Sequence, residues 1–278
     1  MRMNFRFITL IVCLLTFPLV SIAQFQTAAS RSELGVLLGG SYYIGDLNRF
    51  GHFKGTQPAG SLFYRYNINS RVTFRANVSY GNVVGDDAWS KEPEMANRNL
   101  NFRSDIFEFG AGVEFHYMPF QMGNKRYRGT AYFLAQLALF RMNPKTMHDG
   151  EWVNLQPLGT EGQGSSLNAK GHYSLFQMSI PIGLGVKLAL GKRVSIGVEY
   201  GIRKTFTDHL DDVKADSFVD PTELAIVNGP LAATLSNRSL DGSRFGKRGT
   251  SATKDWYAFF GLTLTVKLGN PEKCMFMD

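Results

Sequence analysis

Residues 176–190 read FQMSIPIGLGVKLAL, and this stretch decides the fold. Apolar side chains recur at every second position from Phe176 to Leu190, and polar or small residues, including Gln177, Ser179 and Lys187, lie between them. Such alternation is the pattern of a β-strand with one apolar and one polar face. A tilted strand of ~9–11 residues is long enough to cross a bilayer. The stretch therefore predicts a membrane-crossing β-strand.

Seven further segments of strand length are predicted along the chain. Clear alternation marks residues 72–80, 106–117, 194–203 and 258–268. The other three segments are 33–43, 60–68 and 130–140, and the last is apolar on both faces, so its orientation stays open. With eight strands, an even number, both chain ends fall on the same side of a barrel.

The connections between these segments alternate in length. Residues 69–70 and 191–192 are tight turns and 119–129 is of moderate length, whereas 44–59, 83–105, 141–173 and 207–255 are long. In an up-and-down antiparallel barrel alternate connections share a side, so the four long ones emerge together, as the extracellular loops of outer-membrane barrels do. The prediction is an all-β, eight-stranded antiparallel up-and-down transmembrane β-barrel.

A soluble β-sandwich or lipocalin-like barrel is the alternative, because periodicity alone does not tell the inner face from the outer one. Strand length, the alternation of loop lengths and the glycine-rich polar face favour the membrane. Aromatic residues near strand ends also fit the girdles that lie at membrane interfaces, namely Tyr42, Tyr66, Tyr80, Tyr117, Tyr200 and Trp256.

The N-terminus has the three-part layout of a secretory signal peptide. Arg2 and Arg6 precede an apolar run over 7–20, and Ser21, Ile22 and Ala23 follow it. The run is shorter than the ~20 apolar residues that a spanning helix needs. We therefore expect residues 1–23 to be a signal peptide and 24–278 to form an outer-membrane barrel with four long extracellular loops and a short periplasmic tail.

Charge and cysteine content narrow the function classes. Cleavage of the signal peptide would remove Arg2 and Arg6, which leaves 28 of the 30 basic residues against 23 acidic ones. Basic and acidic residues are interspersed along the chain. The basic residues do not cluster on one face, so the sequence does not indicate nucleic-acid binding. Cys274 is the only cysteine after cleavage, which excludes an intrachain disulfide and a thiolate metal cluster.

The predicted barrel interior carries charges of both signs. An eight-stranded barrel has room inside only for side chains, so it should be a filled body and not a pore. Buried charges persist when they are paired and hydrogen-bonded, and an interior ion network is therefore expected among Arg75, Glu108, Glu114, Lys187, Glu199 and Arg203. The inward set also includes Glu33, Arg65 and Lys267.

Two histidines offer candidates for chemistry at the outer rim. His172 lies near Ser174, and His209 lies within an acidic run, but no G-x-S-x-G or H-E-x-x-H motif supports either of them. The acidic run lacks the spacing of an EF-hand, so a solvated loop is favoured over a calcium site; it comprises Asp208, Asp211, Asp212, Asp216 and Asp220. Residues 159–164 are glycine-rich but follow no βα unit, so they predict a loop. No enzymatic activity, cofactor or small-molecule substrate is expected.

The side that carries the termini offers two surfaces for a partner. One is the 119–129 turn, where Lys125, Arg126 and Arg128 flank Tyr127. Arginine beside an aromatic ring is the composition of interface anchors, although a solvated basic turn is an equally good reading. The other surface is the tail 269–278, which continues past the last predicted strand.

Six segments, in order along nearly the whole mature chain, resemble the PorG family of outer-membrane proteins of the type IX secretion system. They are GGSYYIGDL (39–47), FYRY (63–66), NFRSDIFEF (101–109), LQPLGTEG (155–162), RKTFTDHLDDV (203–213) and KDWY (254–257).

This resemblance implies an integral barrel in the outer membrane of Bacteroidota. It implies association with the periplasmic ring of the secretion apparatus, whose subunits are PorK-like and PorN-like, and a supporting role in protein export and, where the system drives it, in gliding motility. The family has no catalytic residues to carry over. A lipid-modifying barrel enzyme and a general OmpA-like structural barrel remain the alternative functions.

Overall fold

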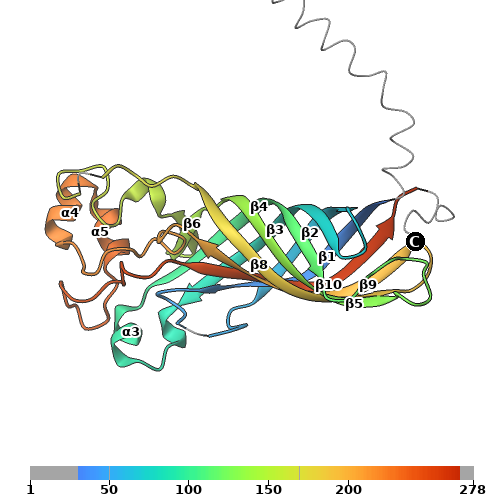
Figure 1. The fold of residues 1–278 in the computed structure, drawn as a ribbon. Helices are drawn as coiled ribbons and strands as arrows, with labels where there is room; N and C mark the ends of the chain where they lie inside the picture. The colour runs from blue at the N-terminus through green and yellow to red at the C-terminus, as the bar shows by residue number, and fades with distance from the viewer. Residues whose placement is uncertain (1–30, 50, 169, 270–278) are drawn as a thin grey trace, which may run out of the picture.

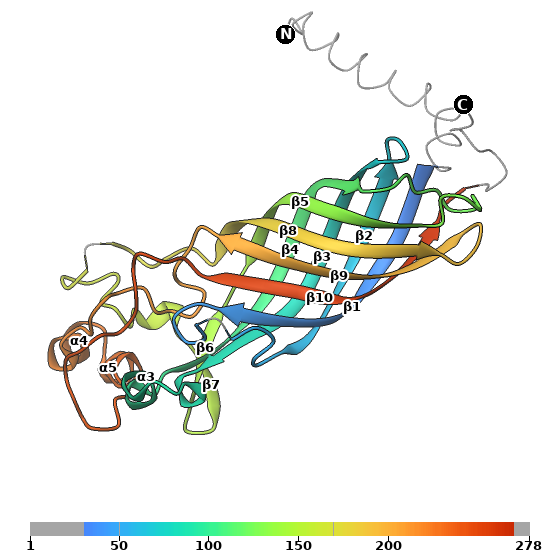
Figure 2. The same ribbon diagram turned by 60° about the horizontal axis from the view of Figure 1, so that its bottom comes forward.

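The structure, a computed structural model, describes residues 31–49, 51–168 and 170–269. The expected signal peptide, Cys274 and the tail beyond Gly269 lie outside these residues. Within them, eight strands pair antiparallel with their neighbours in sequence, and β1 pairs with β10 to close the ring (Figures 1 and 2). The barrel strands are β1 (Ser32–Ile44), β2 (Gln57–Asn67), β3 (Val72–Asp86), β4 (Asn101–His116), β5 (Gly129–Arg141), β8 (Phe176–Ala189), β9 (Val194–Thr205) and β10 (Trp256–Lys267).

The outer wall is apolar and the interior is polar. On β8 the predicted apolar face points outward, and Leu184 is 64% exposed, whereas Glu108 and Glu114 of β4 point inward and are fully buried. The orientation of β5 is now fixed, because Leu137 is 63% exposed while Tyr132 is buried inside. A continuous apolar exterior of this size is unfavourable in water and is the surface of a lipid-embedded barrel. The protein is therefore a β-barrel of the outer-membrane type, as predicted.

The long connections gather at one end of the barrel, opposite the tight turns, as predicted (Figure 1). They cover residues 45–56, 87–100, 142–175 and 206–255. Their elements are η2 (Asp87–Trp89), α3 (Pro93–Arg98), the hairpin of β6 (Pro144–His148) and β7 (Glu151–Asn154), η3 (Gln156–Leu158), α4 (Pro221–Val227) and α5 (Pro230–Ser236). No helix in the described ranges has the length and hydropathy needed to span a bilayer.

The β3–β4 hairpin extends further than the sequence predicted. Its ladder continues past Tyr80 to the pair Asp86↔Asn101, so the connection is 87–100 and not 83–105. The two faces exchange polarity above Tyr80: inward-pointing Val83 and Phe102 are apolar and buried, and Arg103 points outward. An outer face that becomes polar is expected where the strands continue above the hydrocarbon layer. The exchange also interrupts the apolar–polar alternation from which the strand ends were predicted.

Above the level of Tyr80 the barrel has an apolar core like that of a soluble protein. Tyr43 and Phe102 pack edge to face with ring centroids 4.7 Å apart, and Tyr257 packs against Phe140 at 5.2 Å. The remaining members of the cluster come from the strand ends and loops, namely Leu47, Val83, Leu100, Ile106, Met142, Leu210, Val213 and Phe259. We call this upper end of the barrel, with its four long loops, the outer cap.

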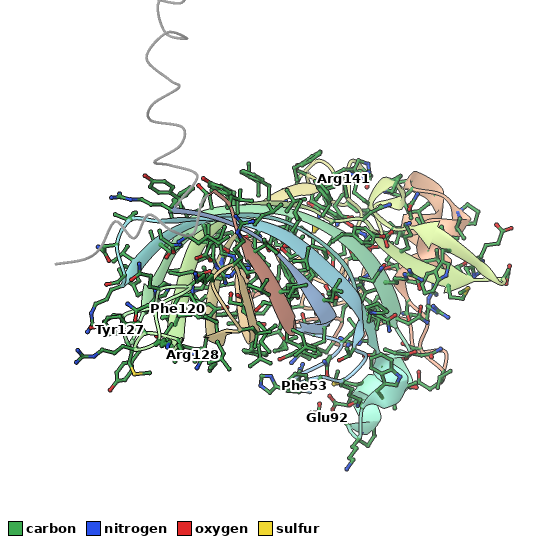
Figure 3. The ribbon with its side chains drawn as sticks, turned by 90° about the vertical axis from the view of Figure 1, so that its right-hand side faces the viewer. Phe53, Glu92, Phe120, Tyr127, Arg128 and Arg141 are labelled. Atoms are coloured by element: carbon green, nitrogen blue, oxygen red, sulfur yellow. The ribbon has the colours of Figure 1, made fainter. Side chains whose placement is uncertain are left out.

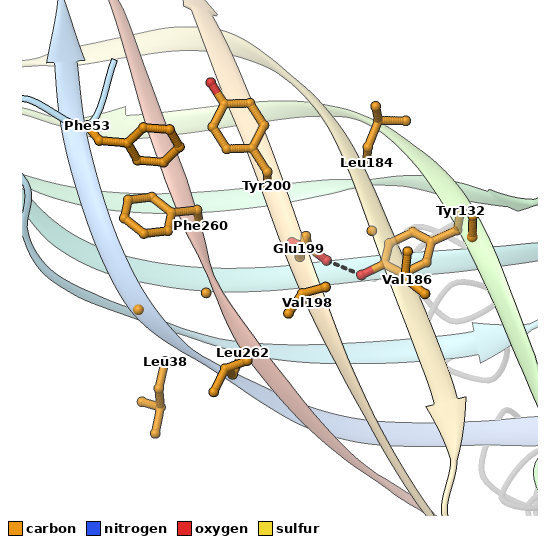
Figure 4. Close-up of a pocket in the computed structure, with 14 residues that line it drawn as sticks. Leu38, Phe53, Tyr132, Leu184, Val186, Val198, Glu199, Tyr200, Phe260 and Leu262 are labelled. Carbon is orange, nitrogen blue, oxygen red and sulfur yellow. Dashed lines mark hydrogen bonds between the residues drawn. The ribbon is translucent and has the colours of Figure 1, made fainter. Parts of the chain in front are cut away.

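One predicted girdle residue has another role. Tyr80 and Tyr117 point outward and are exposed, but Tyr42 is fully buried, because loop 45–56 folds back over the outer wall. Phe53 of that loop packs on Tyr42 with ring centroids 5.1 Å apart, and the Tyr42 and Tyr200 hydroxyls lie 2.6 Å apart. Phe53 and Tyr200 border the upper part of an apolar groove of about 810 Å³ on the lipid-facing wall (Figure 4).

Candidate functional site

The structure brings the six predicted interior charges into ion pairs. Glu114 is the centre: its Oε1 accepts from Arg65 Nε at 2.7 Å and from Arg75 Nη1 at 3.0 Å, and its Oε2 lies 3.2 Å from Lys187 Nζ. Arg75 makes a two-point contact with Glu199. These side chains are almost completely buried, and paired charge is what allows them to remain so.

Aromatic side chains complete the network. The Tyr132 hydroxyl donates to Glu199 at 2.6 Å (Figure 4). Phe63 lies 4.3 Å from the Arg65 guanidinium carbon and 4.2 Å from that of Arg75, measured to the ring centroid. Such cation–π contacts stabilise buried guanidinium groups. The lumen is thus a filled and charge-paired body.

A second ion pair lies higher in the lumen. Arg203 Nε is 3.2 Å from Glu108 Oε2, and the Tyr257 hydroxyl donates to the same oxygen at 2.8 Å. Of the other predicted inward residues, Arg65 belongs to the Glu114 network, whereas Glu33 and Lys267 form no ion pair with it in the described part of the chain. Glu33 accepts from Asn67 at 2.7 Å, and Lys267 is only half-buried at the lower rim, with no ion pair among the described residues.

The outer cap is held together by buried acids, beginning with Asp211 and Asp255. The Tyr43 hydroxyl lies 2.5 Å from Asp211 Oδ2 and 2.9 Å from Asp255 Oδ1. A phenol carries one hydrogen, so both contacts are full hydrogen bonds only when one of the two carboxyls is protonated and donates to the phenol oxygen. Burial, reinforced by neighbouring carboxylates, raises the pKa of both Asp211 and Asp255 well above the usual range.

Arg248 links two of the long loops inside the cap. Its Nη1 donates to Glu161 at 2.6 Å and to the Asp212 carbonyl oxygen at 2.9 Å. The Asp212 carboxylate accepts from the Tyr173 hydroxyl at 2.7 Å and from Thr160. Burial raises the pKa of Asp212 to about 6, against the lowering effect of Arg248.

The remaining two loops join through Arg98 of α3. Its Nε and Nη2 contact Asp87 at 2.7 and 2.6 Å, and Nη2 also donates to the Asp46 carbonyl oxygen at 3.0 Å. The Asp46 carboxylate in turn accepts from the Thr250 backbone N–H at 2.9 Å. All four long loops are therefore tied to one another through buried charges.

These contacts correct the prediction for the acidic run 208–220. It was expected to be a solvated loop, yet Asp208, Asp211 and Asp212 are at most 3% exposed, and only Asp216 and Asp220 lie toward the surface. The reason is that their partners come from distant loops, which local spacing does not reveal. Within the described ranges, no group of three or more His, Cys, Asp or Glu side chains is arranged to hold a metal ion.

The structure does not bring either histidine candidate onto a nucleophile. The Nδ1 atom of His172 lies 2.8 Å from the Gln156 carbonyl oxygen, while the Ser174 hydroxyl donates to Phe176 O at 3.0 Å. His209 stacks on Tyr173 with ring centroids 4.3 Å apart, and burial lowers its pKa to about 4. In the described part of the chain, neither imidazole hydrogen-bonds to a hydroxyl or thiol.

The outer cap should loosen as the pH rises from 7 to 9. An acid whose pKa is raised by folding contributes stability that is present below its unfolded pKa of ~4 and is lost as the pH passes through the folded value. Burial raises the pKa of Asp208 to about 7, so the last part of its loss falls just above pH 7, and the raised pKa values of Asp211 and Asp255 act in the same direction. His209, whose pKa shift has the opposite sign, is neutral in both states above ~pH 7.

The measurement is amide hydrogen exchange across 206–255, expressed as protection factors at pH 7 and pH 9. Lower protection at pH 9 is expected in the parent. Asp211→Asn, which mimics the protonated acid, should reduce this difference, and Asp216→Asn at the surface should leave it unchanged. Equal protection at both pH values in the parent would show that the cap does not depend on the shared proton.

The 119–129 turn closes the opposite end of the barrel. Phe120 and Met122 are buried against Ala189, and Lys187 Nζ lies 4.8 Å from the Phe120 ring centroid. The predicted docking residues sit outside this plug: Lys125, Arg126 and Arg128 are exposed and Tyr127 is half-buried. Arg126 lies over the Tyr127 ring at 5.6 Å. Figure 3 shows Phe120, Tyr127 and Arg128 together, away from Glu92 of the outer cap.

Comparison with protein families gives one match. The model described as "Domain of unknown function (DUF6089)" matches residues 7–220. No curated protein matches the chain significantly.

Several solved structures are similar to the chain. Neisserial surface protein A (NspA) is 12% identical, with a TM-score of 0.42, over 86% of this chain and 98% of that one. Ail of Yersinia pestis, in complex with the heparin analogue sucrose octasulfate, is 9% identical, with a TM-score of 0.40, over 84% and 96%. The N-terminal β-barrel domain of Pseudomonas aeruginosa OprF is 12% identical, with a TM-score of 0.35, over 85% and 97%.

Proposed function

This chain belongs to the DUF6089 family, and we propose that it is a non-enzymatic outer-membrane component of the type IX protein secretion system that anchors or supports the periplasmic ring. The observation that carries the proposal is the resemblance of six segments to the PorG family. Four of these segments, 39–47, 155–162, 203–213 and 254–257, supply the side chains that meet in the outer cap. The segments 63–66 and 101–109 supply Arg65 and Glu108 to the lumen.

The resemblance therefore includes side chains that build a capped and charge-filled barrel. Such a body supports an anchoring role better than a conducting one. The lumen is occupied by ion pairs, the outer cap covers one end, and Phe120 and Met122 block the other. The cap side chains that these segments supply are buried, which argues against a role for those side chains as assembly contacts. The end of the barrel that carries the chain termini then remains for docking.

The 119–129 turn is the proposed docking surface. Its rigidity favours binding, because the plug holds the turn in place: the Gly123 N–H donates to Gly191 O at 3.1 Å, and the Ala189 N–H donates to Arg128 O at 2.6 Å. The basic side chains then project from a fixed base, so little conformational freedom is lost when a partner binds. An acidic surface on PorK-like or PorN-like ring subunits is the expected complement.

Changing Lys125, Arg126 and Arg128 together to serine should reduce co-purification of ring subunits by about tenfold or more, since interface arginines beside aromatic rings carry a large share of binding energy. The measurement is pull-down from detergent-solubilised outer membrane, normalised to the amount of barrel. Lys192→Ser with Arg193→Ser is the matched control, because these exposed basic residues belong to the neighbouring turn at the same end.

Docking and secretion are tested separately. Unchanged co-purification in the triple variant, at parental barrel levels, would place the contact elsewhere but leave the secretion role standing. Deletion of the gene tests that role directly: cargo with C-terminal signals should accumulate in the periplasm. Normal export in the deletion strain would refute the proposed function.

A further inference from the structure

The outer cap contains a cavity that has no part in the proposed anchoring function. It has a volume of about 520 Å³ and lies between loops 142–175 and 206–255. Tyr173 and His209, which stack on each other, form part of its wall, and Phe206, which is 57% exposed, lies beside them. The cavity belongs to the loop end of the barrel, where the outer leaflet and its headgroups are.

Two buried polar atoms on this wall have no hydrogen-bond partner among the described residues. They are Asp208 Oδ2 and His209 Nδ1. Asp208 is only 3% exposed, and the nearest cation, Lys254 Nζ, is 3.6 Å from its oxygen, which is beyond hydrogen-bonding distance. Native proteins satisfy nearly all such atoms. Both residues line the cavity, so hydroxyl or amide groups of a ligand bound there are the candidate partners of these atoms.

Cationic side chains surround the same cavity. Lys170, Lys214 and Lys254 all line it, and neither Lys170 nor Lys214 forms an ion pair within the described part of the chain. The acids beside them are engaged elsewhere: Glu161 binds Arg248, and Asp216 accepts from Ser251 at 2.8 Å. Lys254 is paired with Asp208, but a ligand with an anionic group would meet Lys170 and Lys214, whose charge is not already compensated.

These features together define the chemistry of the ligand. A free inorganic anion would satisfy the lysines but would be repelled by Asp208, and a purely apolar molecule would leave Asp208 and His209 without partners. A sugar that carries phosphate or carboxylate supplies both kinds of group, and its ring has an apolar face that fits against Phe206. The exposed ring and the mixed polar wall are typical of small-molecule sites with a few oriented polar groups.

We propose that this cavity binds an acidic sugar unit of a surface glycan, with Lys170 and Lys214 on the anionic group and Asp208 and His209 on hydroxyl groups. The phosphorylated core sugars of outer-leaflet lipopolysaccharide have this chemistry and lie at the level of the cap. The site would fix the cap relative to the membrane surface, independently of any contact with the periplasmic ring.

The test is calorimetric titration of the full chain in detergent micelles with phosphorylated core oligosaccharide, released from lipopolysaccharide by mild acid hydrolysis. Saturable binding to the parent is expected. Asp208→Asn and Lys214→Gln should each weaken it about tenfold, the effect of losing one charge-assisted hydrogen bond. Lys247→Gln is the matched control, because Lys247 is an exposed lysine of the same loop that does not line the cavity.

The arms of the experiment separate the sources of binding. Dephosphorylated oligosaccharide should bind more weakly than the phosphorylated form, and inorganic phosphate alone should not compete at the same concentration. Binding of phosphate as tight as that of the oligosaccharide would overturn the proposal in favour of a simple anion site. Parental affinity in both Asp208→Asn and Lys214→Gln, or no binding to the parent, would also overturn it.

Discussion

Replacing Glu114 with alanine is expected to destabilise the barrel by about 3–5 kcal/mol, the cost of breaking a buried ion pair by removing one partner. The variant would leave Arg65 and Lys187 inside the lumen without their direct carboxylate partner, and Arg75 with only Glu199. Total stabilities of ~5–15 kcal/mol are usual for folded domains. The loss would therefore be a large fraction of the whole.

The measurement is urea unfolding of the protein refolded into lipid vesicles, with the folded fraction read from the gel band that shifts on boiling. Lys187→Met is the matched control: it removes one cation but leaves Glu114 with Arg65 and Arg75, and methionine fills most of the space of the lysine stem. Its cost should be no more than about 1–2 kcal/mol. Equal losses in the two variants would show that ion pairing does not govern the lumen.

Leu184→Arg should prevent most of the chain from assembling in the outer membrane. Leu184 lies midway along β8 and points outward. An arginine on the lipid face costs about 2–4 kcal/mol at the bilayer midplane and only ~0–1 kcal/mol near an interface. The same substitution at Leu190, which is outward-facing just beyond the end of β8, should therefore be tolerated.

The amount of heat-modifiable barrel in the outer membrane reports this difference, since only the closed barrel changes its mobility on boiling. Leu190→Arg is a better control than a change at the inward neighbour Gly183, where an added Cβ would lie 3.0 Å from the Tyr200 carbonyl oxygen. Normal assembly of Leu184→Arg would mean that this face of β8 is not in contact with the hydrocarbon layer.

The sequence was sufficient to predict the lower barrel because its signals are local. Alternation along β8 and β4 assigns each residue to a face, and buried charges such as Glu114 and Lys187 then need partners, so the interior network could be anticipated without the structure. On β5, Leu134 and Leu137 are both apolar, so only strand pairing could decide which of them points inward. Leu134 does.

The outer cap could not be predicted in the same way, because its contacts join residues far apart in the chain. Asp255 and Tyr43 are separated by 212 positions, and Arg248 and Glu161 by 87. Read locally, Asp208, Asp211 and Asp212 resemble an ordinary hydrated loop. The exchange of polarity between the faces above Tyr80 leaves one local sign in the sequence, the adjacent apolar residues Ile106 and Phe107. Two adjacent apolar residues also occur in irregular strands, so this pair alone does not predict the exchange.

The seam between β1 and β10 has a consequence for the folding pathway. The first and last strands of the barrel must find each other, and Arg65 Nη1 reaches Thr265 Oγ1 across 200 positions of sequence, at 3.0 Å. Closing so long a loop carries an entropic cost, and folds dominated by distant pairings form slowly. Until the seam forms, both terminal strands present unpaired edges that are open to aggregation. The nascent chain should therefore depend on periplasmic chaperones for longest at these two strands.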